Sequence, residues 1–368
     1  MISVTEAEAL LQQVLSGSCD PESCGEERLA TLIGPAEDHG VQELLWSTLV
    51  RVDRAAAVRD TLAPVVRAAA AREVLAQREL QAVGEAMMSG GVPALLTKGA
   101  ALAYTVYPEP WLRPRVDTDI LVRWGDFGAA TRILQGCGYV RSDATNTGAL
   151  VSHQVAFERT DDHGLRHIVD LHWKAANPQM IADALPFDDL WRDAQPVPVL
   201  GPAVRVPSPV GSLALACVHR LAHHQGQNRL IWLYDVKLLA ATLTPGDWTS
   251  LAELACGRGI ATFCLDGLRA ARSHLGGTLP PSVEATLADA APKEPANIYA
   301  EGRVTKRAIL LSDLKVLDTW SDRIRLVREH AFPPAAFIRQ RYGTRARWLL
   351  PALYLHRLVS GASRWVKG

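Results

Sequence analysis

Two aspartates in an otherwise apolar segment constrain this chain more than any other feature. Residues 117–122 read Asp-Thr-Asp-Ile-Leu-Val, a short run of the kind that forms a buried strand. Side chains two apart in a strand point to the same face, so we expect Asp117 and Asp119 side by side while the alternate residues face the core. Adjacent carboxylates repel each other unless a cation neutralises them. The pair therefore indicates a cation site, although paired aspartates also occur in helix caps and turns.

A third aspartate fits the same logic. Residues 168–173 read Ile-Val-Asp-Leu-His-Trp, which predicts another strand with Asp170 and His172 on one face. Three carboxylates from two adjacent strands could hold two metal ions, roughly 3.5–4 Å apart, that clamp the attacking and leaving oxygens of a phosphoryl or nucleotidyl transfer. Mg²⁺, or Mn²⁺ in its place, is the expected ion because it prefers oxygen ligands and accompanies phosphate substrates.

The pattern of apolar and polar residues along the sequence predicts the organisation of the chain. Residues 1–90 show helical periodicity, whereas residues 91–206 alternate short apolar strands with helices. Helices return in residues 207–295, which we expect to close a cleft, although the Pro- and Ala-rich stretch 279–295 is expected to be a connection. Residues 296–368 form a basic, mostly helical tail. We therefore predict an α+β fold in which a small mixed β-sheet core is flanked by N-terminal and C-terminal α-helical regions.

The surroundings of the aspartates resemble the nucleotidyltransferase signature of a strand, a small-residue turn, a helix and a strand bearing D-x-D. More closely, the chain is similar to a family of uncharacterised nucleotidyltransferases in the DNA polymerase β-like nucleotidyltransferase superfamily, from about residue 40 to residue 275. The turn departs from the superfamily pattern because Ala100 stands where Ser or Gly is usual. The matching stretches are residues 39–41, 96–102, 112–122, 138–139, 170–173, 219–223 and 232–235.

The resemblance implies transfer of a nucleoside monophosphate from an NTP to a hydroxyl or phosphate acceptor. Asp117, Asp119 and Asp170 would be the catalytic, metal-binding residues. The acceptor could be a small molecule, a peptide or RNA, and the sequence leaves this choice, the preferred NTP and the oligomeric state open. Two alternatives also stay open: another phosphotransfer on the same fold, and a catalytically degenerate fold serving as a partner-binding, antitoxin-like module. Retention of all three carboxylates disfavours degeneracy, because an unused acidic cluster costs free energy.

Several residues next to the aspartates are expected to contact the nucleotide. Gly99 permits close approach of the backbone to a phosphate, and the helix N-terminus that includes Ala100 offers N–H groups. Lys98 would supply a point charge to the triphosphate, and Arg113 a forked guanidinium. Arg115, on the same loop as Arg113, is expected to be solvated.

Four more polar residues complete the predicted site. His172 is expected to hydrogen-bond a carboxylate or the acceptor, with a structural role at the strand end as the alternative. His219 and His223 lie one helical turn apart, but Arg220 stands where the metalloprotease motif requires Glu. We therefore place this histidine pair, together with Asp235, in a polar seam between two helices that lines the nucleotide cleft.

The composition of the chain indicates its general class and its location in the cell. The chain has 48% hydrophobic and 21% charged residues and no formal net charge, which is typical of a soluble globular protein. From residue 303 onward, however, 14 Lys and Arg face only 4 Asp and Glu. Such a segment can contact phosphates or anionic lipid, or can be a solvated face that answers an acidic neighbour. The six cysteines lack zinc spacing, no apolar run reaches a membrane span, and the start lacks a signal peptide's basic patch, so we expect a cytoplasmic protein.

Overall fold

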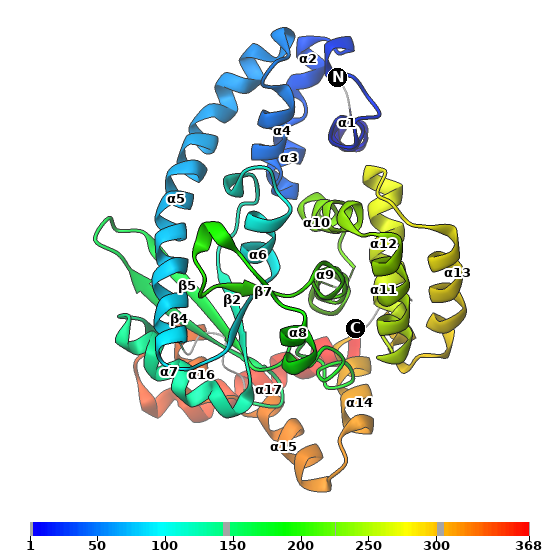
Figure 1. The fold of residues 1–368 in the computed structure, drawn as a ribbon. Helices are drawn as coiled ribbons and strands as arrows, with labels where there is room; N and C mark the ends of the chain where they lie inside the picture. The colour runs from blue at the N-terminus through cyan, green and yellow to red at the C-terminus, as the bar shows by residue number, and fades with distance from the viewer. Residues whose placement is uncertain (1–2, 143–147, 225, 300–304, 368) are drawn as a thin grey trace.

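A computed structural model describes residues 3–142, 148–224, 226–299 and 305–367, without the side chains of residues 306 and 361–367. Figure 1 shows a central sheet with the long helix α5 along one side and helices α9 to α13 on the other. The N-terminal helices lie above the sheet in that view, and helices α14 to α17 lie below it.

The N-terminal region is helical, as predicted. Ser3 begins the first helix with a capping box, in which its side chain accepts from the Glu6 backbone while the Glu6 carboxylate accepts from Ser3. Gly17 ends that helix in the left-handed conformation, with φ of 81°. The helices are α1 (Val4–Ser16), α2 (Glu26–Ala30), α3 (Ile33–His39), α4 (Gln42–Leu49) and α5 (Ala56–Ser89).

The sheet has seven strands in the order β3-β4-β5-β2-β1-β7-β6. Strand β2 is central, pairing antiparallel with β1 and parallel with β5, so the sheet is mixed and the predicted α+β class is confirmed. The strands are β1 (Ala94–Thr97), β2 (Thr118–Val122), β3 (Val140–Ser142), β4 (Gln154–Thr160), β5 (Arg166–His172), β6 (Gln195–Pro196) and β7 (Arg205–Val206). The helices among them are α6 (Lys98–Thr105), α7 (Phe127–Gly136) and α8 (Phe187–Arg192).

The two faces of β2 pack on different cores. Ile120 and Val122 join a cluster with β4, β5 and α7, as the alternation predicted. Leu121 points the other way, into the large cluster formed with the helical regions. Asp119 shares the face of Leu121, so its carboxylate lies where the sheet meets the helices that follow it.

The helices after the sheet differ from expectation at one place. The stretch expected to be a connection contains the helix α13, because Pro281 occupies its first position, where a missing N–H costs nothing. Val283 and Leu287 then bury themselves against the preceding helices. The helices of this region are α9 (Pro209–His224), α10 (Leu230–Thr242), α11 (Pro245–Gly257), α12 (Ala261–Leu275) and α13 (Pro281–Ala290).

The final segment is helical, and its contacts with the rest of the molecule include two hydrogen bonds to backbone groups. The Asp313 carboxylate accepts a hydrogen bond from the Met180 backbone (3.3 Å), and Glu329 accepts one from the Leu150 backbone (2.8 Å). None of the described helices has the length and apolar character needed to cross a membrane. The segment contains α14 (Lys306–Val316), α15 (Trp320–Ala331), α16 (Ala335–Arg341) and α17 (Leu350–Lys367).

Candidate active site

A row of polar residues crosses the three central strands. Thr97 of β1 is the register partner of Asp119 of β2, and Asp119 is the partner of Asp170 of β5. Directly paired residues of neighbouring strands point to the same face, so the two carboxylates lie next to each other. The sequence predicted these two aspartates on adjacent strands, and the strand pairing places them in one row.

Asp119 is the best-partnered carboxylate of the row. Its Oδ1 accepts hydrogen bonds from Lys98 Nζ (2.6 Å) and from His172 Nε2 (2.8 Å). Burial alone would raise the pKa of Asp119, but the Lys98 ammonium and the hydrogen bond from His172 hold it well below its usual range. His172 therefore contacts a carboxylate, which was one of its two predicted roles.

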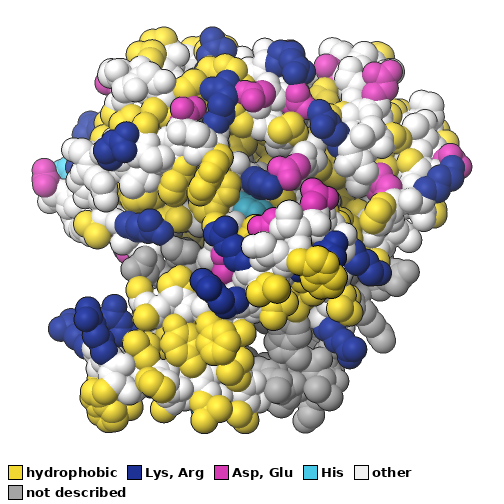
Figure 2. All heavy atoms as spheres, turned by 90° about the horizontal axis from the view of Figure 1, so that it is seen from below, with side chains coloured by type: hydrophobic (Ala, Val, Ile, Leu, Met, Phe, Trp, Pro, Cys, Tyr) yellow, Lys and Arg dark blue, Asp and Glu magenta, His cyan; other side chains and the backbone are white. Residues whose placement is uncertain are grey.

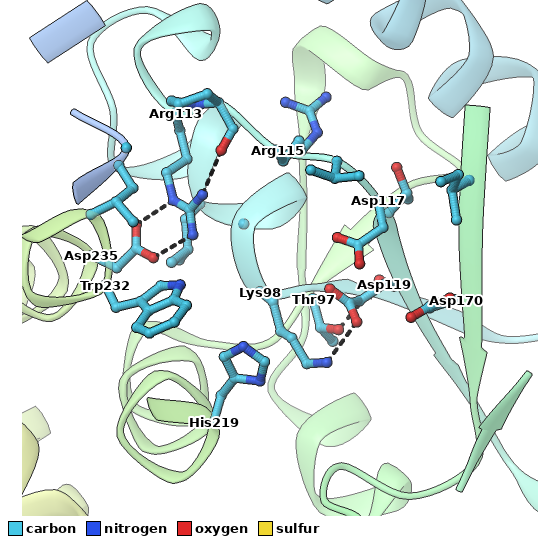
Figure 3. Close-up of a pocket in the computed structure, with 18 of the residues that line it drawn as sticks. Thr97, Lys98, Arg113, Arg115, Asp117, Asp119, Asp170, His219, Trp232 and Asp235 are labelled. Carbon is cyan, nitrogen blue, oxygen red and sulfur yellow. Dashed lines mark hydrogen bonds and ion pairs between the residues drawn. The ribbon is translucent and has the colours of Figure 1, made fainter. Parts of the chain in front are cut away.

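The other two carboxylates carry charge that is poorly compensated. Burial, followed by the negative charges of Asp119 and Asp117, raises the pKa of Asp170 to about 7. Burial and the charge of Asp119 also raise the pKa of Asp117. Asp117 comes directly before the first residue of β2, and Figure 3 shows its side chain near those of the other two aspartates, which line the same cavity.

This arrangement fits a divalent cation. One ligand atom from each of Asp119, Asp170 and His172 lies within 4.8 Å of the others, and all three residues are buried. Asp117, which the sequence placed in the metal set, lies beside this compact group rather than within it. Carboxylate oxygens are hard donors, and a bound cation would relieve the burial cost and mutual repulsion that raise the pKa values of Asp117 and Asp170.

Arg113 makes a buried ion pair with a distant residue. Its Nε and Nη2 donate to the two oxygens of Asp235, each at 2.7 Å, and its Nη1 donates to the Pro114 carbonyl (2.7 Å). Burial would lower the pKa of Arg113, but the facing Asp235 carboxylate raises it. The hydroxyl of Tyr107 also donates to Asp235 (2.7 Å). All three nitrogens of the guanidinium that was predicted to bind phosphate thus donate to protein oxygens.

The small residues Gly99 and Ala100, in the turn after β1, are packed closely against other groups of the protein. A Cβ at Gly99 would lie 3.2 Å from three atoms of the Arg113 guanidinium, so the group that closely approaches this backbone is Arg113. Ala100 is buried against Leu80 and Leu96 and can offer a ligand only its backbone N–H. Lys98, at the start of α6, has φ of 52°, in the left-handed region.

Arg115 was expected to be solvated, and that expectation is wrong. Its guanidinium makes two hydrogen bonds to Glu73 of α5, at 2.6 and 2.9 Å, and its side chain is 8% exposed. The Tyr104 hydroxyl binds the same carboxylate. This cluster fastens the loop before β2 to the long helix α5.

The histidines of α9 face the aspartates across the cavity. The rings of His219 and His223 stack with centroids 5.2 Å apart, and His224 Nε2 lies 3.1 Å from His219 Nε2. Burial and then the Lys98 charge lower all three pKa values, to about 3 for His223 and about 4 for His224. Within the described residues, His219 Nδ1 and His223 Nε2 are buried without a hydrogen-bond partner. Neutral rings with unused nitrogens therefore line the wall.

Several residues that line the two walls were not predicted from the sequence. His224 stacks on Trp232, with centroids 3.8 Å apart, and the Arg229 guanidinium lies 5.3 Å from that ring. Gln154 donates to Asp170 from the neighbouring strand β4. A signal for His224 was present, since it follows His223 directly, but nothing local marks Arg229 or Gln154.

The aspartates and the histidines enclose one large cavity. Its volume is about 1030 Å³, and it lies between the sheet on one side and α9 and α10 on the other. Figure 3 shows Asp117, Asp119 and Asp170 on one wall, with Lys98 between them and His219 and Trp232. This volume is at the upper end of what small-ligand pockets occupy. A ligand as large as a nucleotide can therefore contact both walls.

A mixed sheet flanked by helices, with acidic residues aligned on adjacent central strands, is consistent with a nucleotidyltransferase domain. The chain belongs to the family of uncharacterised nucleotidyltransferases, whose model matches residues 26–276. No curated protein matches the chain. The matched segment contains every residue of the cavity described above and ends before α13.

Proposed function

We propose that this cavity transfers a nucleoside monophosphate from an NTP to a hydroxyl or phosphate acceptor, with release of pyrophosphate. The observation that carries the proposal is the row of Asp119 and Asp170 on paired strands, opening into a cavity of nucleotide size. Membership of a nucleotidyltransferase family supports the same general reaction. The acceptor would be a small molecule, a peptide or RNA.

We assign the binding of Mg²⁺ or Mn²⁺ to Asp119 and Asp170, with Asp117 as the third carboxylate at the rim. A bound divalent ion would neutralise the negative charge shared by the carboxylates and the triphosphate. His172 holds the Asp119 carboxylate in place through its hydrogen bond. The raised pKa of Asp170 supports this assignment, because it marks a position where a cation would relieve repulsion.

Lys98 would change partner during nucleotide binding. Its ammonium neutralises Asp119 when no other cation is near, and the start of α6 places it at the edge of the cavity. A triphosphate bound next to Asp119 offers it a second anionic partner. The backbone N–H groups of Gly99 and Ala100 lie at the same helix start and would also face phosphate.

We assign Arg113 and Asp235 mainly to holding the site in place. Their bidentate pair joins the loop before β2 to α10, and the Arg113 guanidinium lies close to the backbone of Gly99. His219 and His223 would present their unused ring nitrogens to the nucleotide or to the acceptor. On this view residues 207–295 supply the second wall of the cleft.

The test is a calorimetric titration of ATP, GTP, CTP and UTP into the purified chain, each with Mg²⁺ and again with EDTA. We expect metal-dependent binding of at least one NTP, and loss of that binding in Asp170→Asn. Asp183→Asn, which changes an exposed aspartate paired with Lys174, is the matched control. If no NTP binds at millimolar concentration to the folded protein, the alternative of a partner-binding module takes the place of this proposal.

A further inference from the structure

The segment after the family match carries exposed apolar side chains that the proposed reaction does not use. We call residues 305–367 the basic tail. Of the eighteen large hydrophobic side chains that are exposed among the described residues, ten lie in this tail, from Leu311 to Val359. Exposed apolar side chains that cluster in one region mark an interaction surface.

Helix α15 has one face toward the protein and one toward solvent. Leu326 is fully buried, and Glu329 accepts from the Leu150 backbone, so this face is packed. Arg323 and Arg328 flank the opposite face on its two sides, as the helical spacing of 100° per residue requires. That opposite face carries an apolar stripe at positions i, i+4 and i+7, formed by Trp320 (75% exposed), Ile324 (66%) and Val327 (45%).

Helix α17 is divided in the same way. Its inner face packs on the helices before it, since the Tyr354 hydroxyl donates to the Pro333 carbonyl (2.6 Å) and Arg357 lies 5.6 Å from the Phe337 ring. The outer face, about 100–200° away around the helix, continues from the turn before it. It is formed by Trp348 (80% exposed), Leu355 (63%) and Val359 (66%).

Three arginines precede the second stripe in the sequence. Arg341, Arg345 and Arg347 are exposed, and within the described part of the chain none of their side chains forms an ion pair or hydrogen bond. Seen from below, Figure 2 shows hydrophobic side chains gathered on this side of the molecule, with Lys and Arg side chains at their edges. The surface therefore joins apolar stripes to uncompensated positive charge.

We propose that the basic tail docks the protein on a membrane surface that contains anionic lipids. Helices with Trp and Leu on one face and Arg at the flanks lie in the headgroup region, where the apolar face enters the acyl boundary and the cations meet lipid phosphates. A nucleic-acid backbone would use the arginines but would leave both apolar stripes in water. The combination of stripe and charge favours the lipid surface.

The location of the tail fits this role. It lies outside residues 26–276, the segment that the family shares, and it is attached to the β-rich region by Asp313 and Glu329. Docking would therefore bring the cavity close to the membrane without using any residue of the cavity. Docking of the tail would not depend on nucleotidyl transfer.

The test is sedimentation of the full chain with vesicles of phosphatidylcholine, alone or with one third phosphatidylserine, at low and physiological salt. We expect binding to the anionic vesicles only, weakened by salt. Arg345→Gln and Arg347→Gln should each lower the affinity about fivefold, the equivalent of ~1 kcal/mol per cation at an anionic surface. Trp320→Ala and Trp348→Ala should each lower it roughly tenfold.

The control is Trp124→Ala, which removes another exposed tryptophan, 61% exposed, outside the tail. It should leave vesicle binding unchanged, and circular dichroism should show all the variants folded. Absence of sedimentation with the anionic vesicles overturns the proposal. So does salt-sensitive binding of a polyuridine RNA by a chain that ignores anionic vesicles, because that result assigns the arginines to nucleic acid.

Discussion

Lys98 and Asp119 form a buried ion pair, with Nζ 2.6 Å from Oδ1, at the point where β1 gives way to α6. Lys98 Nζ also lies 3.5 Å from His172 Nε2, so the ammonium sits inside the compact group that could hold a metal ion. An ammonium and a divalent cation compete for the same carboxylate. The structure thus contains its own counter-ion for the carboxylate row.

Competition between Lys98 and a divalent cation for Asp119 predicts that replacing Lys98 has opposite effects on the binding of metal alone and of metal with nucleotide. Lys98→Met should raise the affinity for Mn²⁺ alone by about tenfold or more, because a unit charge at about 4 Å contributes ~4 kcal/mol at an effective dielectric constant of 20. The same variant should bind Mn²⁺–ATP more weakly. Electron paramagnetic resonance of Mn²⁺ and calorimetry measure the two affinities. Lys293→Met, from an exposed surface pair, is the control. A fall in both affinities would contradict the prediction.

The two central carboxylates should differ in what they do for stability. Asp170→Asn removes a poorly compensated buried charge, so without metal we expect a higher Tm than wild type. Asp119→Asn removes the anion that faces Lys98 and His172, so we expect a lower Tm. Both variants should lose at least about 100-fold in turnover. Thermal melts in EDTA and a pyrophosphate-release assay check the two parts. Equal Tm changes would contradict the charge assignment.

The Arg113–Asp235 pair predicts strong coupling between two distant segments. Arg113→Met or Asp235→Leu alone should cost about 3–5 kcal/mol of unfolding free energy, because each leaves a buried charge without its partner. The double variant should cost clearly less than the sum. Urea unfolding of the four proteins gives the coupling energy. If Arg113 served only to bind phosphate, the two losses of unfolding free energy would add in the double variant.

Asp313 predicts a pH dependence at the attachment of the tail. Burial raises its pKa to about 6, above the value of about 3.9 of an unfolded chain. The folded state therefore binds the proton more tightly, and stability falls as the pH rises from about 4 to 6. Asp313→Asn keeps an acceptor for the Met180 backbone and should raise Tm at pH 7, with the gain fading toward pH 4. A gain that does not depend on pH would argue against this cause.

The sequence by itself determined the elements that carry the acidic row. Strand β2, residues 118–122, lies within the predicted run of residues 117–122, because a short apolar run flanked by polar residues is a local signal. The alternation of side chains then fixes Asp119 on the face opposite Ile120. Membership of the nucleotidyltransferase family, predicted from motifs spread along the chain, is confirmed by the match to residues 26–276.

Only the tertiary structure decided which charges meet. Arg113 lies 122 residues from Asp235, and Arg115 lies 42 residues from Glu73, so no local pattern pairs them. Packing withdrew both arginines from solvent and gave each a carboxylate, because a buried guanidinium without a partner is costly. Strand register likewise aligned Asp119 with Asp170 and placed Lys98 between them and the α9 histidines. The local spacing of residues determines on which face of a strand or helix a side chain lies. Tertiary packing determines which side chains from other elements it meets there.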